Sequence, residues 1–311
     1  MNILLAEPRG FCAGVERAIA IVERALETFS PPIYVRHEIV HNRWVVESLR
    51  NKGAVFVHEL DEVPDGAVAI FSAHGVSKEV EAEGQKRPLK ILDATCPLVA
   101  KVHREAERSD QEGRRVILIG HKGHPEVVGT LGQLPEGRMA VISRVEEIDI
   151  LPFGPDTPTA YVTQTTLSMD ETSEVIGALK ERFPDLRGPA REDICYATQN
   201  RQNAVKSLAE QCDLILVLGA PNSSNSNRLR EVAHRCGTKA YLIESARDVR
   251  EEWLEGVKQL GVTAGASAPE ILVDELLERL KGRIDRVETL AVSQENLAFP
   301  LPRELQSSRN S

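Results

Sequence analysis

The chain lacks paired cysteines: its 311 residues include five, and no two of them form a CxxC motif. An odd number of widely spaced cysteines argues against a disulfide framework. The missing CxxC pairs argue against a zinc ribbon or a thioredoxin-like site. Apolar runs such as Leu214–Leu218 are too short to cross a bilayer, and no basic, apolar leader opens the sequence. We therefore expect a cytoplasmic protein with no membrane partner.

Lys and Arg are outnumbered by Asp and Glu, 38 to 47, which gives a formal net charge of −9. This balance argues against nucleic acid as a partner. The sequence contains neither a cluster of Lys and Arg nor a GxxxxGK[ST] phosphate-binding loop. An anionic substrate must then be attracted by a local site, because the overall field of the protein repels it.

The segment Ile3–Leu26 predicts a strand, a turn and a helix. An apolar run begins at Ile3 and is broken at Pro8, after which apolar residues recur at helical spacing from Val15. Cys12 lies in the turn between the two elements. Ligands of open α/β sheets bind at this position, and the positive end of a helix dipole favours a thiolate there.

The same arrangement recurs at two further cysteines. Cys96 follows a short strand and precedes a helix that opens at Pro97, and Cys195 also precedes a helical pattern. A polar group follows each cysteine after 28 or 29 residues, and another after 62 to 72 residues. These groups begin, in chain order, at His41, His74, His124, Thr165, Ser223 and Ser267.

This threefold recurrence predicts an α/β fold of three similar units in a pseudo-threefold, trefoil-like arrangement. The expected units are residues 14–96, residues 97–193, and residues 1–13 with 194–283, followed by a C-terminal tail at 284–311. In this arrangement the three thiols converge on one point, surrounded by helix amino termini that carry neutral hydrogen-bond donors. Such donors suit a diphosphate.

Three converging cysteines leave several interpretations open. An iron–sulfur cubane normally has four thiolate ligands, so three leave one iron free for a substrate oxygen. Zinc with an open fourth position and a purely structural role are the alternatives. An aconitase-like hydro-lyase and a non-catalytic iron–sulfur sensor also fit the pattern. Cys212 and Cys236 are expected to be packing residues.

The residues at these positions also resemble a known family. The matching stretches are FCAGVERAI, VHN at 40–42, SAHGVS, DATCPLV, GHPEVVGT, VTQTTLS, DICYATQNRQ, NSSNSNRL and TAGASAPE. The chain is similar over nearly its whole length to the LytB/IspH family of 4-hydroxy-3-methylbut-2-enyl diphosphate reductases. The motifs are long, and the sequence departs from none of them.

The resemblance implies a cofactor and a reaction. Cys12, Cys96 and Cys195 are expected to hold a [4Fe-4S] cluster, which becomes [3Fe-4S] once its apical iron is lost. The apical iron takes the substrate hydroxyl, which leaves as water after two electrons and two protons have been added. The products are isopentenyl and dimethylallyl diphosphate, at the last step of the methylerythritol phosphate route to isoprenoids. Reduced ferredoxin or flavodoxin is the expected electron donor.

The resemblance also implies residue roles. Glu126 is the expected proton source, assisted by Thr165 and His124. The diphosphate is expected to lie among three protonated histidines and the polar residues of the final third. The predicted diphosphate-binding residues are His41, His74, His124, Ser223, Ser224, Asn225 and Ser267.

Overall fold

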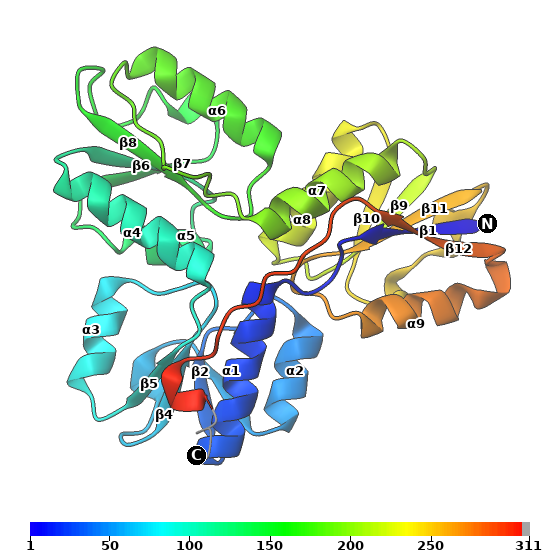
Figure 1. Cartoon of the computed structure of the whole chain (residues 1–311), viewed down its shortest axis with the longest axis horizontal. Coiled ribbons are helices and arrows are strands. Elements are labelled where there is room, and N and C mark those ends of the chain that lie inside the picture. Colours follow the sequence, from blue (N-terminus) through cyan, green and yellow to red (C-terminus); the bar gives the residue numbers. More distant parts are fainter. Residues whose placement is uncertain (307–311) are drawn as a thin grey trace. The chain divides into compact units, whose positions relative to one another are not determined.

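The computed structural model describes residues 1–306, in which strands and helices alternate along the chain. The strands form three sheets, and every strand pair within them is parallel (Figure 1). The predicted α/β class is confirmed, and the three parallel sheets are consistent with three similar units. In this part of the chain no helix is both long enough and apolar enough to cross a membrane.

Tertiary contacts divide the chain into two compact units. Unit 1 comprises Met1–Val15, His41–Val45 and Cys195–Leu297, and unit 2 comprises Glu16–Val40, Val46–Ile194 and the chain from Ala298. Unit 1 contains one sheet and unit 2 contains the other two. The boundaries predicted for three separate units, and the trefoil-like arrangement of these units, stay a prediction.

The three sheets share one strand order, which supports the predicted repeat. In each, the first strand after a cysteine-led helix lies between the second and the third. The orders are β3 (Ala54–Val57), β2 (Ile33–Arg36), β4 (Val68–Phe71) and β5 (Lys90–Asp93); β7 (Met139–Ile142), β6 (Arg115–Ile119) and β8 (Thr159–Thr163); and β10 (Lys239–Ile243), β9 (Leu214–Leu218), β11 (Gln259–Ala264), β1 (Asn2–Glu7) and β12 (Arg286–Ala291). A further pairing lies beside each third strand: β5 on β4, β1 on β11, and a single bridge from Arg187 to Ala160 in β8.

Both faces of the unit 1 sheet are buried, which explains its nearly continuous apolar strands. Leu4 and Ala6 of β1 pack with α7 (Tyr196–Ala209) and α8 (Ser224–Arg235). Ile3 and Leu5 point to the opposite face and pack with α9 (Ile271–Leu280). Cys212 is buried in the first of these cores, as predicted, whereas Cys236 at the end of α8 is exposed, so the expectation that it packs inside is wrong.

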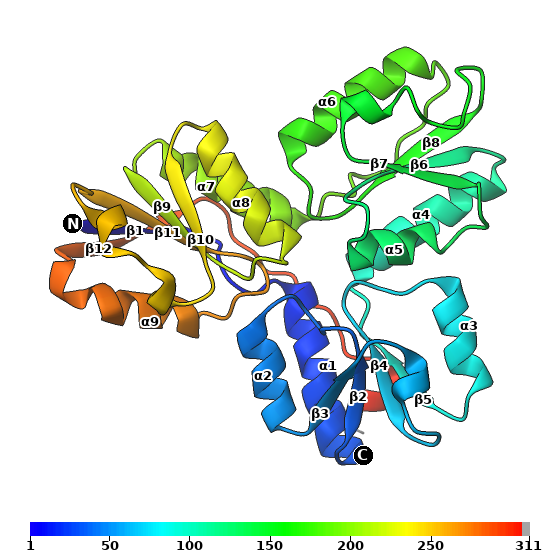
Figure 2. The same cartoon turned by 180° about the vertical axis from the view of Figure 1, so that it is seen from behind.

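In unit 2 the sheet of β6–β8 also has two covered faces (Figure 2). α6 (Met169–Arg182) packs on one face, and α4 (Pro97–Gln111) with α5 (Pro125–Leu131) packs on the other. The buried residues of the β2–β5 sheet pack against Val80 of α3 (Lys78–Lys86). The two remaining α-helices of the described residues are α1 (Ala13–Phe29) and α2 (Arg43–Asn51). The Ser168 side chain caps α6, since it accepts the Glu171 N–H.

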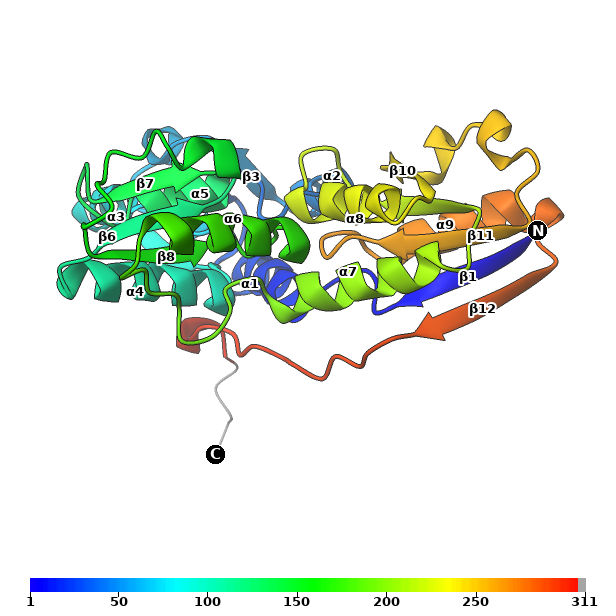
Figure 3. The same ribbon diagram turned by 90° about the horizontal axis from the view of Figure 1, so that it is seen from above.

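The segment predicted as a tail contains a strand that sequence patterning missed. β12 pairs with β1 along its whole length and lies beside it at the edge of the sheet (Figure 3). Its side chains are mostly exposed, so it carries no apolar alternation, and its pairing depends on backbone hydrogen bonds to β1. Further on, Leu305 is 2% exposed and Pro300 accepts a hydrogen bond from Arg17, both within unit 2. Residues 307–311 of the predicted tail lie outside the described part.

Candidate active site

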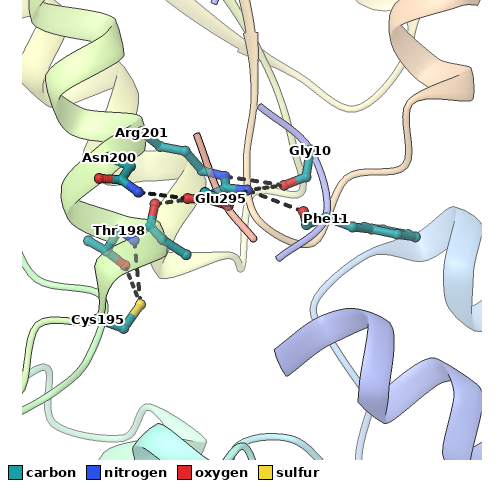
Figure 4. A network of polar contacts seen from close by, with 8 residues as sticks. Gly10, Phe11, Cys195, Thr198, Asn200, Arg201 and Glu295 are labelled. Carbon is teal, nitrogen blue, oxygen red and sulfur yellow. Dashed lines mark hydrogen bonds and ion pairs between the residues drawn. The ribbon is translucent and has the colours of Figure 1, made fainter. Parts of the chain in front are cut away.

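Two of the three predicted iron ligands lie in unit 1, at the start of two helices. Cys12 precedes α1, and its backbone N–H donates to the Ala266 carbonyl at 3.3 Å. Cys195 caps α7, where its Sγ accepts the Thr198 N–H at 3.4 Å (Figure 4). Burial and then the charge of Cys12, with a smaller contribution from Cys195, raise the pKa of Tyr196 to about 12. Both cysteines are therefore close enough to the Tyr196 phenol to act on its pKa.

The loops before α8 and α9 carry predicted diphosphate-binding residues of unit 1. Ser223 caps α8 and accepts the Ser226 N–H, while Ser267 donates to the His41 carbonyl at 3.0 Å. His41 Nδ1 also lies 3.3 Å from the Asn222 amide nitrogen. Four of the predicted diphosphate-binding residues (His41, Ser223, Asn225 and Ser267) thus lie on neighbouring loops of one unit, and Ser224 is the first residue of α8.

Asn225 supplies an unsatisfied amide in this loop cluster. The residue is 5% exposed, and neither its Oδ1 nor its Nδ2 has a hydrogen-bond partner. A Cβ added at Gly219 or at Gly265 would lie 2.1 Å from Ser226 Oγ. The ends of β9 and β11 therefore approach the start of α8 too closely for any side chain. The unpartnered Asn225 amide is the candidate hydrogen-bonding group of this cluster for a ligand.

In unit 2, His74 and His124 meet at the ends of strands from different sheets. Their rings lie 5.7 Å apart in an edge-to-face arrangement. His124 caps α5, and its Nδ1 accepts the Glu126 N–H at 3.2 Å. While Nδ1 accepts this bond, Nε2 is the ring nitrogen from which His124 can donate. The protonation of the three histidines stays a prediction.

Glu126 is the buried carboxyl group of this unit. It is 4% exposed, its Oε1 accepts the Thr165 N–H at 2.6 Å, and its Oε2 accepts the Thr165 hydroxyl at 3.0 Å. Burial raises the pKa of Glu126 to about 7, although both hydrogen bonds from Thr165 act in the opposite direction. A carboxyl group with this pKa is a suitable general acid at neutral pH.

The third predicted iron ligand, Cys96, lies in unit 2. It caps α4, and its N–H donates to the Ala73 carbonyl at 3.0 Å, next to His74. Within residues 1–306 no three His, Cys, Asp or Glu side chains form a group that could hold a metal ion. The site of all three cysteines therefore stays a prediction.

Comparison with known proteins decides the family. The LytB protein family matches residues 3–281. The chain belongs to the LytB protein family.

Named relatives of this LytB chain match it from end to end. One from Magnetococcus marinus is 70% identical, and the match covers 98% of this chain and 99% of that protein. Another, from Ectopseudomonas mendocina, is 60% identical and covers 98% of each. Both are named 4-hydroxy-3-methylbut-2-enyl diphosphate reductase. A solved structure, described as E-1-hydroxy-2-methyl-but-2-enyl-4-diphosphate reductase from Plasmodium falciparum, superposes with a TM-score of 0.95 at 38% identity, covering 98% of this chain and 96% of that one.

Sequence reasoning missed one buried ionic residue of this LytB chain. Arg201 is fully buried on α7, where it pairs with Glu295. A signal was present, because Arg201 falls on the same helical face as the apolar Ala197, Ala204 and Leu208. A charged residue on an apolar face requires a buried partner. The partner itself, 94 residues away, was not recognisable from the sequence.

A second buried ion pair was also missed, in unit 2. Asp193, two residues before Cys195, accepts hydrogen bonds from Lys101 at 2.9 Å and from the Thr163 N–H at 2.9 Å. Lys101 also donates to the carbonyls of Arg191 and Glu192. This pair ties the helix after Cys96 to the end of β8, which leads to Thr165. It therefore stabilises the strand end that carries the Glu126 partner.

Proposed function

We propose that this protein is a 4-hydroxy-3-methylbut-2-enyl diphosphate reductase of the methylerythritol phosphate route. It removes the allylic hydroxyl of its substrate as water, using two electrons and two protons, and forms isopentenyl or dimethylallyl diphosphate. The family membership and the full-length relatives of that name support the reaction. The observation in the site that carries the proposal is Glu126, a buried carboxyl group with a pKa of about 7.

Cys12, Cys96 and Cys195 are the residues proposed to hold a [4Fe-4S] cluster. The donor set fits this group, because none of the three thiols belongs to a disulfide among the described residues and each lies at the start of a helix. A helix amino terminus favours the thiolate that iron requires. Three protein ligands leave one iron open. When bound, the cluster supplies the electrons that reduce the carbon–oxygen bond.

Glu126 supplies the proton that converts the leaving hydroxyl into water. At neutral pH a large fraction of its carboxyl group is protonated, because its pKa is about 7. The Thr165 hydroxyl, 3.0 Å from Oε2, is placed to relay this proton and to hydrogen-bond the substrate hydroxyl. His124 adds a donor at Nε2, because its Nδ1 accepts the Glu126 N–H.

The diphosphate is proposed to bind through neutral donors. Asn225 offers a buried amide with no protein partner, and Ser223, Ser224 and Ser267 lie on the same loop cluster. His41 and His74 complete the proposed set. Donors in a closely packed loop cluster can hold an anion in a protein whose net charge is −9. The electron donor is proposed to be a reduced ferredoxin or flavodoxin, and the reaction is placed in the cytoplasm.

Anaerobic purification tests the proposal. We expect iron and sulfide, with no stoichiometric zinc, and turnover that requires a reductant. Cys96→Ser should lose iron, whereas Cys236→Ser, which changes an exposed cysteine, should keep it. Zinc in place of iron, or activity without any reductant, would contradict the proposal and favour a zinc enzyme or a hydro-lyase.

A further inference from the structure

Arg201 is the most completely enclosed charge in unit 1, with 0% of its side chain exposed (Figure 4). Its guanidinium donates to the Gly10 carbonyl at 3.2 and 2.8 Å and to the Phe11 carbonyl at 3.2 Å. It also donates to the Ala197 carbonyl at 2.9 Å, one turn earlier in α7. The Glu295 carboxylate accepts hydrogen bonds from both terminal nitrogens of Arg201, at 3.0 to 3.3 Å.

These contacts connect three segments that are distant in sequence. Gly10 and Phe11 come directly before Cys12, and α7 begins directly after Cys195. Glu295 belongs to the stretch that follows β12, and it also accepts a hydrogen bond from Asn200 at 3.0 Å. One guanidinium thus joins the loop of Cys12, the helix of Cys195 and a carboxylate from near the end of the chain.

The chemistry of this pair requires all of its partners. A fully buried guanidinium is costly unless its N–H groups are hydrogen-bonded and its charge is paired. Here the backbone carbonyls of Gly10, Phe11 and Ala197 satisfy the donors, and Glu295 balances the charge. Gly10 has a φ of +68°, and a Cβ there would approach the Ala268 carbonyl to 3.3 Å. The turn before Cys12 is therefore held through the backbone carbonyls of Gly10 and Phe11, beside the Arg9–Glu270 ion pair.

We propose that Arg201 and Glu295 are positioning residues that fix Cys12 next to the first turns of α7. The role extends the proposed function, since Cys12 and Cys195 are two of the proposed iron ligands. Through Glu295, the segment after β12 helps to hold the turn before Cys12. Loss of the carboxylate leaves the guanidinium charge without a balancing partner, so the Gly10–Phe11 turn opens more often.

Native alkylation of the cluster-free, full-length protein tests this directly. Each cysteine is followed by mass spectrometry, with the exposed Cys236 as an internal reference. In Glu295→Gln we expect Cys12 to react roughly tenfold faster, the factor produced by loss of about one charge-assisted hydrogen bond, while Cys236 is unchanged. Arg201→Lys keeps the charge but loses the planar fork, so a smaller increase is expected. Glu288→Gln changes an exposed carboxylate on β12 and should behave as wild type.

Iron release to a chelator from reconstituted protein gives a second readout. Glu295→Gln should release iron several-fold faster than wild type and Glu288→Gln. Wild-type reactivity of Cys12 in both Glu295→Gln and Arg201→Lys would overturn the proposal, and so would an equal rise at all five cysteines. If wild type itself holds no iron, the proposed function fails, whereas the alkylation result still decides the role of the pair.

Discussion

Glu126→Gln separates the chemistry of the buried carboxyl group from its structural role. The pKa of Glu126 rises from an ordinary value of 4.5 to about 7 because the group is buried. A shift of this size corresponds to about 3 kcal/mol. Gln has nearly the same shape, its Oε1 can still accept the Thr165 N–H, and it never ionises. It therefore resembles the protonated acid.

The sign of the stability change follows from proton binding. Between pH 4.5 and about 7 the folded state binds more protons than the unfolded state at Glu126, so the free energy of unfolding decreases as the pH rises. Above pH 7 the wild type carries the whole penalty of ionising a buried group. We expect Glu126→Gln to be more stable than wild type at pH 8, by up to about 3 kcal/mol, and close to it near pH 4.5.

Urea unfolding of the cluster-free protein, followed by circular dichroism at both pH values, measures this difference. Turnover of Glu126→Gln should fall by a factor of roughly 100 to 10,000, while its iron content stays at the wild-type level. The wild-type rate should decrease above about pH 7, where the acid loses its proton. Glu136→Gln, at an exposed site in the same unit, should change neither quantity.

Two results would refute this reasoning. Equal destabilisation of Glu126→Gln at pH 4.5 and pH 8 would mean that burial does not raise the pKa of Glu126. Full turnover in Glu126→Gln would remove this group from the proton path.

Three further predictions concern buried groups elsewhere in the chain. Asn225→Leu should weaken inhibition by inorganic diphosphate about tenfold without lowering stability, because the amide has no protein partner; unchanged inhibition would exclude it from the anion site. Gly265→Ala should lower the free energy of unfolding, measured by urea titration, by about 1–3 kcal/mol, and Ser226→Ala should partly restore it; no loss would show that the 2.1 Å approach relaxes freely. Burial lowers the pKa of His103 from 6.5 to about 4, so the free energy of unfolding should fall by about 3 kcal/mol as the pH decreases through that range. His103→Gln should abolish this pH dependence, and an equal dependence in the variant would assign it to other groups.

Local patterning predicted most of the elements around the site. The helix start at Pro97 was predicted at the residue where it lies, because proline and the apolar period act within a few residues. The strand β12 was missed because pairing with β1 depends on a sheet edge, and its exposed side chains carry no period of their own. Edge pairing is a property of the tertiary structure and leaves little trace in one segment.

The candidate site was likewise predicted in part from the sequence and in part only from the structure. Sequence motifs identified Glu126 and Thr165, but only the packed structure showed the two hydrogen bonds between them and the burial that raises the pKa of the acid. Likewise, only the structure showed that His124 Nδ1 accepts the Glu126 N–H in the first turn of α5. Desolvation and hydrogen-bond geometry depend on atoms supplied by several elements, so residue types alone do not determine them.

The sequence by itself determined the three-sheet α/β class, the repeated cysteine-led helices and the family, because periodicity, breakers and long motifs are local properties of the chain. Only the tertiary structure decided which partners the buried charges have. Arg201 was visible as a charge on an apolar face, yet its pairing with Glu295 arises because β12 contacts α7 and Glu295 follows β12 by four residues. Long-range pairing of this kind follows from packing, and packing is decided by the whole fold at once.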